Sequence, residues 1–265
     1  MFWSNLYFGA AGGELALAAA PGGASIQAIL LDIEGTTTPI DFVFKTLFPY
    51  ARRCLGQFLR EHGSESEVRA DIEALRAQHR ADSAENLNPP PWQDRSPGAE
   101  VESASVYGLW MIDRDSKCTA LKSLQGKIWQ EGYAKGELHG EVYPDVPPAF
   151  GRWSSQGKIM AIFSSGSVLA QKLLFGSTPA GDLTRFLRAY FDTTSGPKQA
   201  PASYLKIAEA IGIAPPNILF VSDVARELDA AREAGMQTAL CVRSGPASAV
   251  ASAHRVIRTF AEIPD

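Results

Sequence analysis

The chain has 265 residues, 45% of them hydrophobic, and its 25 Lys and Arg against 29 Asp and Glu give a formal net charge of −4. This is the composition of a soluble globular protein with one large domain, or with a core domain and a smaller second one. Nucleic acid and anionic membranes are poor candidate partners, because both are bound through clustered Lys and Arg. No apolar run reaches the roughly 18 residues that a membrane-spanning helix needs.

The N-terminal segment 1–25 is rich in Ala and Gly and contains no Lys or Arg. Its short apolar stretch, 15–20, therefore lacks the basic region of a secretory signal. We expect residues 1–25 to be a disordered extension and the protein to be cytoplasmic.

The next segment predicts a buried strand and then a helical insertion. Residues 26–33 form a short apolar run that ends in acids and is followed by Gly-Thr-Thr-Thr-Pro, which is typical of a strand and a loop. Residues 43–80 and 101–133 carry apolar side chains at helical spacing, and the Pro-rich segment 86–98 predicts an irregular surface loop between them. With no strand pattern in this region, we expect an all-α insertion after the first strand.

After Pro144 the pattern alternates between strands and helices. Short apolar runs predict strands at 158–163, 189–191, 217–221 and 237–242, and helical spacing predicts helices at 168–175, 204–211 and 225–234. Such alternation indicates an α/β fold with a parallel sheet that helices cover on both faces.

The cysteines and histidines exclude two classes of site. Cys54, Cys118 and Cys241 lie far apart and form no Cys-x-x-Cys motif, so neither a disulfide framework nor a thiolate zinc site is expected. The four histidines include no pair at metal-ligand spacing on one helix face, and we interpret each as structural or solvated.

The candidate functional residues follow the predicted strands, because ligands of an open α/β sheet bind at the carboxyl ends of its strands. They are Asp32, Glu34 and Thr36 after the first strand, Ser164 and Ser165 after the second, Asp223 after the fourth, and Lys198 in a loop. Each has a structural alternative: Asp32 as a strand-end cap, the serines or Asp223 as helix caps, Lys198 as a solvated charge. Glu227, one turn beyond Asp223, could either support the site from behind or simply form an exposed helix pair.

Taken together, these residues suit phosphoryl transfer. A carboxylate can attack phosphorus and form an aspartyl-phosphate, which divides one difficult hydrolysis into two easier steps. Because carboxylates repel a phosphate, a hard cation such as Mg²⁺ is needed beside them. Hydroxyl groups and an ammonium group then hold the phosphate oxygens.

Ordered motifs give a resemblance to a known family. Asp32-Ile-Glu-Gly-Thr, Ser164, Lys198 and Ser222-Asp223 resemble the four motifs of the haloacid dehalogenase-like hydrolase superfamily. The longer segments 31–40, 48–52, 121–129, 163–167 and 190–198 resemble its enolase-phosphatase family, also called acireductone synthase, of methionine salvage. The resemblance runs from about residue 26 to 245, and residues 1–25 have no counterpart in it.

The resemblance implies a fold and a reaction. The fold is a haloacid dehalogenase-like, Rossmannoid parallel-sheet core, residues 26–42 and 145–265, with an inserted all-α cap domain, residues 43–144. The family enolises 2,3-diketo-5-methylthiopentyl-1-phosphate and then removes its phosphate, which yields 1,2-dihydroxy-3-keto-5-methylthiopentene. It uses one Mg²⁺ per subunit, and we expect a monomer.

The resemblance also assigns roles to residues. Asp32 becomes the nucleophile and a metal ligand, Glu34 a catalytic residue of the metal site, and Asp223 a metal ligand. Ser164, Ser165 and Lys198 become substrate binders. Most superfamily phosphatases have Asp where this chain has Glu34, and the extra methylene leads to the hypothesis that Glu34 also takes the carbon-bound proton in enolisation.

Three alternatives stay open at this point. One is a related phosphatase for another small phosphate ester, and another is a dehalogenase, which needs no metal and would leave these acids without a cation. The third is a non-catalytic binding module. Trp110, Trp129 and Tyr133 are candidates for contact with the methylthio tail, although aromatic residues at helical spacing more often belong to a core.

Overall fold

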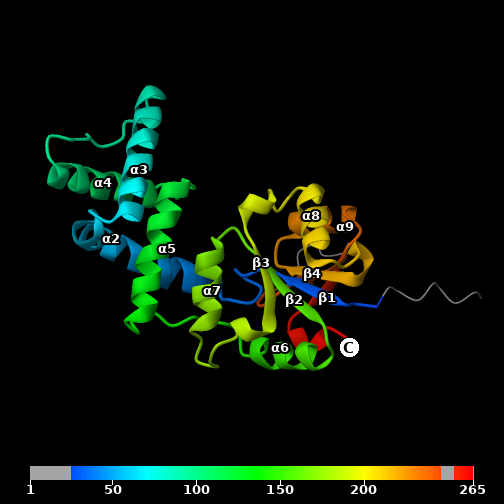
Figure 1. Ribbon diagram of the computed structural model, residues 1–265. Coiled ribbons are helices and arrows are strands. Elements are labelled where there is room, and N and C mark those ends of the chain that lie inside the picture. Colours follow the sequence, from blue (N-terminus) through cyan, green and yellow to red (C-terminus); the bar gives the residue numbers. More distant parts are fainter. Residues whose placement is uncertain (1–24, 246–253, 265) are drawn as a thin grey trace, which may run out of the picture.

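A computed structural model describes residues 25–245 and 254–264 (Figure 1). Ser25 is the first described residue, and its carbonyl oxygen accepts a hydrogen bond of 2.8 Å from the side-chain amide of Asn217. The expectation of a disordered extension therefore falls, apart from Ser25, on residues outside the described part of the chain.

The described residues form one parallel sheet of six strands in the order β3-β2-β1-β4-β5-β6. The strands are β1 (Ala28–Leu31), β2 (Ile159–Phe163), β3 (Leu187–Phe191), β4 (Ile218–Ser222), β5 (Gln237–Cys241) and β6 (Arg255–Ile257). Leu31 pairs with Ile162 on one side and with Val221 on the other, so β1, β2 and β4 end at the same level. The α/β parallel-sheet expectation is confirmed, while the three-residue β6 is too short to give a sequence pattern.

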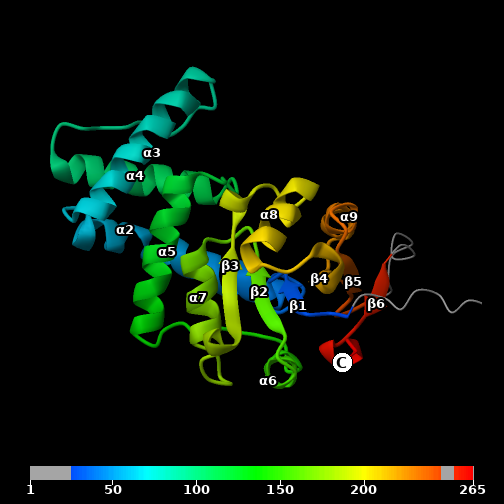
Figure 2. The ribbon, with the colours of Figure 1, turned by 45° about the vertical axis from the view of Figure 1, so that its right-hand side comes forward.

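Alternate residues of the strands face two separate hydrophobic clusters. Ile29 and Leu31 belong to the cluster that includes α6 (Val146–Ser155) and α7 (Val168–Gly176). Ala28 and Leu30 belong to the cluster that includes α8 (Pro201–Ile211) and α9 (Ala225–Glu233). Because successive side chains of a strand point to opposite faces, helices cover both faces of the sheet, as Figure 2 shows from a second side.

Residues 40–134, between β1 and β2, form a helical region beside the sheet (Figure 1). It contains α1 (Ile40–Phe42), a π-helical segment (Val43–Leu47), α2 (Phe48–His62), α3 (Ser66–Ala84), α4 (Pro97–Ile112) and α5 (Thr119–Ala134). The helical patterns of 43–80 and 101–133 are each divided in two, by turns at 63–65 and 113–118. The Pro-rich loop is present but ends at Ser96, whose hydroxyl caps α4 by accepting a hydrogen bond from the N–H of Ala99.

Helix α6 was not expected, because its sequence carries two prolines after Val146. Both prolines lie in the first turn, where a helix has no use for their missing N–H groups. Behind them Ala149, Phe150 and Trp153 are buried at helical spacing against the sheet.

Arg243 joins the two chain passages that lead into and out of the helical region. Its Nε and Nη2 donate hydrogen bonds of 2.9 and 2.6 Å to the carbonyl oxygen of Thr36, in the loop after β1. Its Nη1 donates to both carboxylate oxygens of Asp145, just before α6, at 2.8 and 2.7 Å. The loop after β1, which carries Glu34 and Thr36, is therefore held by a residue that follows β5, on the other side of β4.

Two exclusions made from the sequence can be compared with the described residues. Cys54, Cys118 and Cys241 are all free thiols. Within residues 25–245 and 254–264, no helix is long and apolar enough to cross a bilayer.

Candidate active site

Asp32 lies at the centre of the sheet edge, directly after β1, and is 2% exposed. Its N–H continues the strand ladder to the carbonyl of Val221, and its own carbonyl accepts a hydrogen bond of 3.0 Å from the hydroxyl of Thr37. The carboxylate has a partner on each oxygen: Oδ1 lies 2.5 Å from Nζ of Lys198, and Oδ2 lies 3.3 Å from Oγ of Ser222. The carboxylate is therefore held at the mouth of the sheet by both backbone and side-chain contacts.

Lys198 connects Asp32 with a second buried acid, Glu227. Its Nζ lies 2.7 Å from Oε2 of Glu227, and the hydroxyl of Tyr204 donates a hydrogen bond of 2.7 Å to the Lys198 carbonyl. Burial lowers the pKa of Lys198, but the two carboxylates outweigh burial and raise it, so the ammonium group stays charged. Lys198 thus contacts the candidate nucleophile directly.

Glu227 is a site residue that the sequence left undecided between a supporting role and an exposed position. It is 9% exposed, and Oε2 lies 3.1 Å from Oγ of Ser222 as well as next to Lys198. Burial, followed by the charge of Asp32, raises its pKa to about 7. The sequence does place Glu227 in the first turn of a helix that follows a strand end, which is a common position for site residues. Whether that turn faces the site or solvent depends on how α9 packs, and the sequence does not give this.

Asp223 follows β4 and lies against the loop that begins with Glu34. A Cβ atom on Gly35 would be 2.2 Å from Oδ2 of Asp223, and Gly35 has a φ of +73°, so only glycine fits this close approach. Burial and the neighbouring charge of Asp32 raise the pKa of Asp223 to about 6. Asp32 and Asp223 therefore interact electrostatically at the same edge.

Glu34 and Ser164 meet on the side of this edge that faces the helical region. Oγ of Ser164, a fully buried residue, lies 3.4 Å from Oε2 of Glu34 and accepts a hydrogen bond of 3.1 Å from the N–H of Gly166. Burial, and then the charge of Asp32, raises the pKa of Glu34. The helix cap of α7 is neither Ser164 nor Ser165 but Ser167, which accepts a hydrogen bond from the N–H of Ala170.

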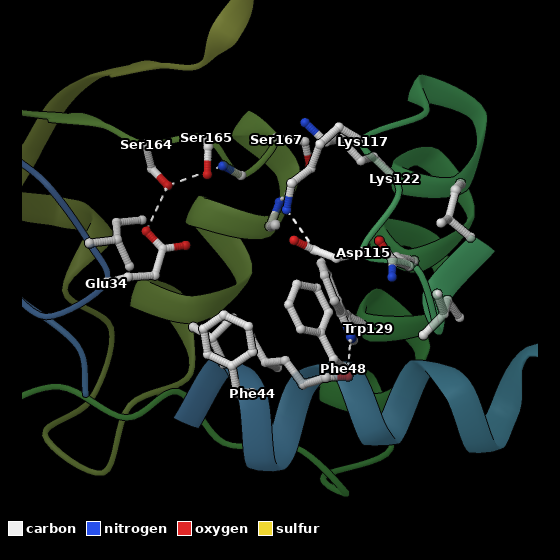
Figure 3. A pocket seen from close by; sticks show the side chains of 18 of the residues that line it. Glu34, Phe44, Phe48, Asp115, Lys117, Lys122, Trp129, Ser164, Ser165 and Ser167 are labelled. Carbon is white, nitrogen blue, oxygen red and sulfur yellow. Dashed lines mark hydrogen bonds and ion pairs between the residues drawn. The ribbon is translucent and has the colours of Figure 1, made fainter. Parts of the chain in front are cut away.

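A cavity of about 270 Å³ separates the sheet edge from the helical region. Figure 3 shows Glu34, Ser164 and Ser165 on one side of it and Phe48 and Trp129 on the other. Asp32, Lys198 and Asp223 lie outside its lining. The predicted residues thus form two adjoining groups. Asp32, Lys198 and Asp223 form an ionic cluster, and Glu34, Ser164 and Ser165 line the cavity. Glu34 connects the two groups, because it lies two residues after Asp32 in the chain.

The three aromatic candidates have different surroundings. Trp129 lines the cavity, and its Nε1 donates a hydrogen bond of 2.9 Å to the carbonyl of Leu47. Trp110 stacks on Tyr107 with ring centroids 5.6 Å apart. The buried hydroxyl of Tyr133 has no hydrogen-bond partner among the described residues, and neither Trp110 nor Tyr133 lines the cavity.

A separate cluster of two acids and a histidine lies within the helical region. Glu61, His62 and Glu131 each place one possible ligand atom within 4.8 Å of the others. Both ring nitrogens of His62 already face acids, since Nδ1 lies 2.6 Å from Oε1 of Glu65 and Nε2 lies 3.4 Å from Oε2 of Glu131. This agrees with the interpretation of His62 as a structural residue.

The parallel sheet and the acids at its edge define the class of protein. The haloacid dehalogenase-like hydrolase family matches residues 26–235. The chain is 51% identical over 239 residues to Enolase-phosphatase E1 of Synechococcus elongatus, which covers 90% of this chain and 98% of the relative. It is 47% identical to Enolase-phosphatase E1 of Pseudomonas aeruginosa over the same shares. The chain therefore belongs to the enolase-phosphatase family of haloacid dehalogenase-like hydrolases, which confirms the resemblance.

Solved structures agree with this membership. The UTR4 protein of Saccharomyces cerevisiae is 32% identical, with a TM-score of 0.71 over 90% of this chain and 100% of that one. A haloacid dehalogenase-like phosphatase from Thermococcus onnurineus, 19% identical over 90% of this chain and 96% of that one, has a TM-score of 0.55 and shows the shared fold.

We predict that Glu227 makes the metal-free protein less stable as pH rises. Its pKa is about 7 in the folded state against 4.5 for an ordinary glutamate, so the folded state binds the proton more tightly than the unfolded state. The free energy of unfolding should fall between pH ~4.5 and ~7, with at most about 3 kcal/mol from this group. Urea unfolding at pH 5 and pH 8 in chelator measures this.

Glu227→Gln should remove much of that pH dependence, and the exposed Glu209→Gln serves as the matched control. An unchanged pH dependence in Glu227→Gln would mean that the raised pKa does not affect stability.

Proposed function

We propose that this protein is an Mg²⁺-dependent enolase-phosphatase that converts 2,3-diketo-5-methylthiopentyl-1-phosphate into 1,2-dihydroxy-3-keto-5-methylthiopentene and phosphate. The observation that carries the proposal is the placement of two acids. Asp32 is held in an ionic cluster suited to phosphoryl transfer, while Glu34, two residues later, opens into the adjoining cavity. One small substrate can therefore present its phosphate to Asp32 and its carbon skeleton to Glu34.

Hydrolysis uses Asp32 as the nucleophile. A carboxylate oxygen of Asp32 forms a bond to phosphorus, the bond from phosphorus to the ester oxygen breaks, and Glu34 gives a proton to the departing oxygen. A water molecule, from which Glu34 takes a proton, then attacks the phosphorus and releases Asp32. The ammonium of Lys198 and the hydroxyl of Ser164 are placed to hold phosphate oxygens, and Ser165, on the cavity wall, to contact the substrate.

The charges of the site support a metal. Asp32, Glu34, Asp223 and Glu227 share one edge of the sheet, and the one ammonium group among them, that of Lys198, contacts only Asp32 and Glu227, so the acids outnumber the cation. Oxygen donors of this kind suit Mg²⁺, which we propose is held by Asp32 and Asp223 with Glu34 as the third metal-site residue. Bound there, Mg²⁺ would neutralise charge on the phosphate oxygens.

Enolisation precedes hydrolysis and uses Glu34 on carbon. Because burial raises its pKa, Glu34 can accept the proton from the carbon next to the carbonyl and return it to oxygen. It then takes up a proton from solvent, which is the proton that it gives to the departing oxygen in hydrolysis. We propose that residues 43–144 act as a cap domain on the core of 26–42 and 145–265, since the helical region forms the opposite wall of the cavity and would exclude water from the enol. A monomer in the cytoplasm stays a prediction.

The first test is a Mg²⁺-dependent assay on the diketo phosphate that follows enol absorbance and phosphate release separately. Asp32→Asn should reduce phosphate release by about a thousandfold or more, because an amide is not a nucleophile for this reaction. Phosphate release at the wild-type rate in this variant would exclude Asp32 as the nucleophile. A wild-type protein that acts on other phosphate esters but not on this substrate would favour the alternative of a related phosphatase.

The second test separates the two roles of Glu34. Glu34→Asp withdraws the carboxylate by about one bond length, on the order of 1 Å, to which catalytic geometry is sensitive. Enolisation should decrease more than hydrolysis of a simple ester such as phenyl phosphate, for which no proton leaves carbon. An equal decrease of both rates would show that Glu34 has no separate role on carbon.

A further inference from the structure

Gln125 is a buried amide on the cavity wall that the helical region provides. It lies on α5 between Leu121 and Trp129, four residues from each, so the three side chains share one face of the helix. All three line the cavity, and Gln125 is 6% exposed. The amide is therefore enclosed by protein on every side except that of the cavity.

The Gln125 side chain makes no hydrogen bond to any residue in the described part of the chain. Its polar atoms are not among the fully buried atoms that lack a partner, so they remain accessible on the cavity side, where water or a ligand can satisfy them. Gln171, across the same cavity and 1% exposed, is a direct comparison. Its Nε2 donates hydrogen bonds of 2.9 Å to the carbonyls of Gly166 and Phe191, while its Oε1 is buried without a partner, so the N–H₂ group of Gln171 is used within the protein and that of Gln125 is not.

The surroundings of Gln125 indicate what would satisfy it. Leu121 and Trp129 flank it, and Val43, Leu47 and Phe48 also line the cavity. Phe44 lines the cavity too and is 57% exposed, which leaves an apolar surface that a ligand could cover. A fitting ligand thus has an apolar end and an oxygen that accepts a hydrogen bond from an amide N–H.

We propose that Gln125 binds the keto oxygens of the diketone substrate and, through them, determines which phosphate esters the enzyme accepts. The proposal rests on the proposed function and deepens it. The side-chain N–H₂ donates to a carbonyl oxygen, and this hydrogen bond strengthens when enolisation places negative charge on that oxygen. The apolar residues beside Gln125 take the thioether end.

This role is separate from the phosphate chemistry. Of the groups proposed to hold the phosphate, Asp32 and Lys198 lie outside the cavity lining and Ser164 lies on the sheet-edge wall, whereas Gln125 comes from the opposite wall. Gln125 should therefore matter for a substrate with keto oxygens and not for a phosphate ester that has none.

The test uses Gln125→Met, which keeps the length of the side chain and removes its hydrogen-bonding groups. Two substrates are compared with the Mg²⁺-loaded protein: the diketo phosphate and phenyl phosphate, whose leaving group is apolar and has no carbonyl. For the diketo phosphate, kcat/KM should fall about 10- to 100-fold, the range for a hydrogen bond to a charged oxygen. For phenyl phosphate it should stay within about twofold of wild type. Gln130→Met, at an exposed position of the same helix, is the matched control and should change neither value.

Two results would overturn the role of Gln125. Equal loss with both substrates would mean that Gln125 supports the fold or the phosphate site, and no loss with either would mean that it does not contact the substrate. If Gln125→Met does not fold, Gln125→Glu takes its place, because a carboxylate of the same size should repel the enolate and give the same substrate dependence. A wild-type protein that hydrolyses phenyl phosphate but not the diketo phosphate would instead contradict the proposed function, and with it this role.

Discussion

The ion pairs of Lys198 with Asp32 and Glu227 are the interaction on which the site depends. They bring a cation between two buried acids at 2.5 and 2.7 Å, and Asp223 and Glu34 lie close enough for Asp32 to raise the pKa of each. Acids do not gather in a buried place without counter-charges. The lysine supplies part of the positive charge, and the proposed magnesium ion supplies the rest.

Much of the surrounding structure keeps these acids together. The register of β1 with β4 puts Asp32 beside Ser222, whose hydroxyl lies between Asp32 and Glu227. Gly35 lets the backbone approach the carboxylate of Asp223. Sheet register and one glycine thus determine how close the charges lie, and this proximity adds to burial in raising the pKa of Asp223.

The cavity separates recognition from phosphoryl chemistry. The sheet edge contributes Glu34, Ser164 and Ser165, whereas the helical region contributes apolar side chains and the amide of Gln125. Change in the helical wall would therefore alter which leaving group fits while the ionic cluster stays intact. Glu34 belongs to both parts, because the charge of Asp32 raises its pKa and its side chain lines the cavity.

The strands and the residues at their ends could be predicted from the sequence, because a short apolar run followed by an acid or serine gives both the element and its functional end. Asp32, Ser164 and Asp223 were found in this way. Glu227 could not be decided, since a glutamate in a first helical turn looks the same whether the turn faces solvent or a lysine. Gln125 was missed because it interrupts an apolar helix face, and whether its amide has a partner depends on the packing of α5 beside α7.

Calorimetric titration of the metal-free protein with Mg²⁺, in buffers of different ionisation enthalpy, tests the central claim most directly. At pH 6, where burial keeps Asp223 and Glu227 partly protonated, binding should release protons, and the release should decrease toward pH 8. Asp223→Asn should weaken binding by about tenfold or more. Binding that releases no protons at pH 6, or that is unchanged in Asp223→Asn, would contradict the account of a carboxylate edge completed by a divalent cation.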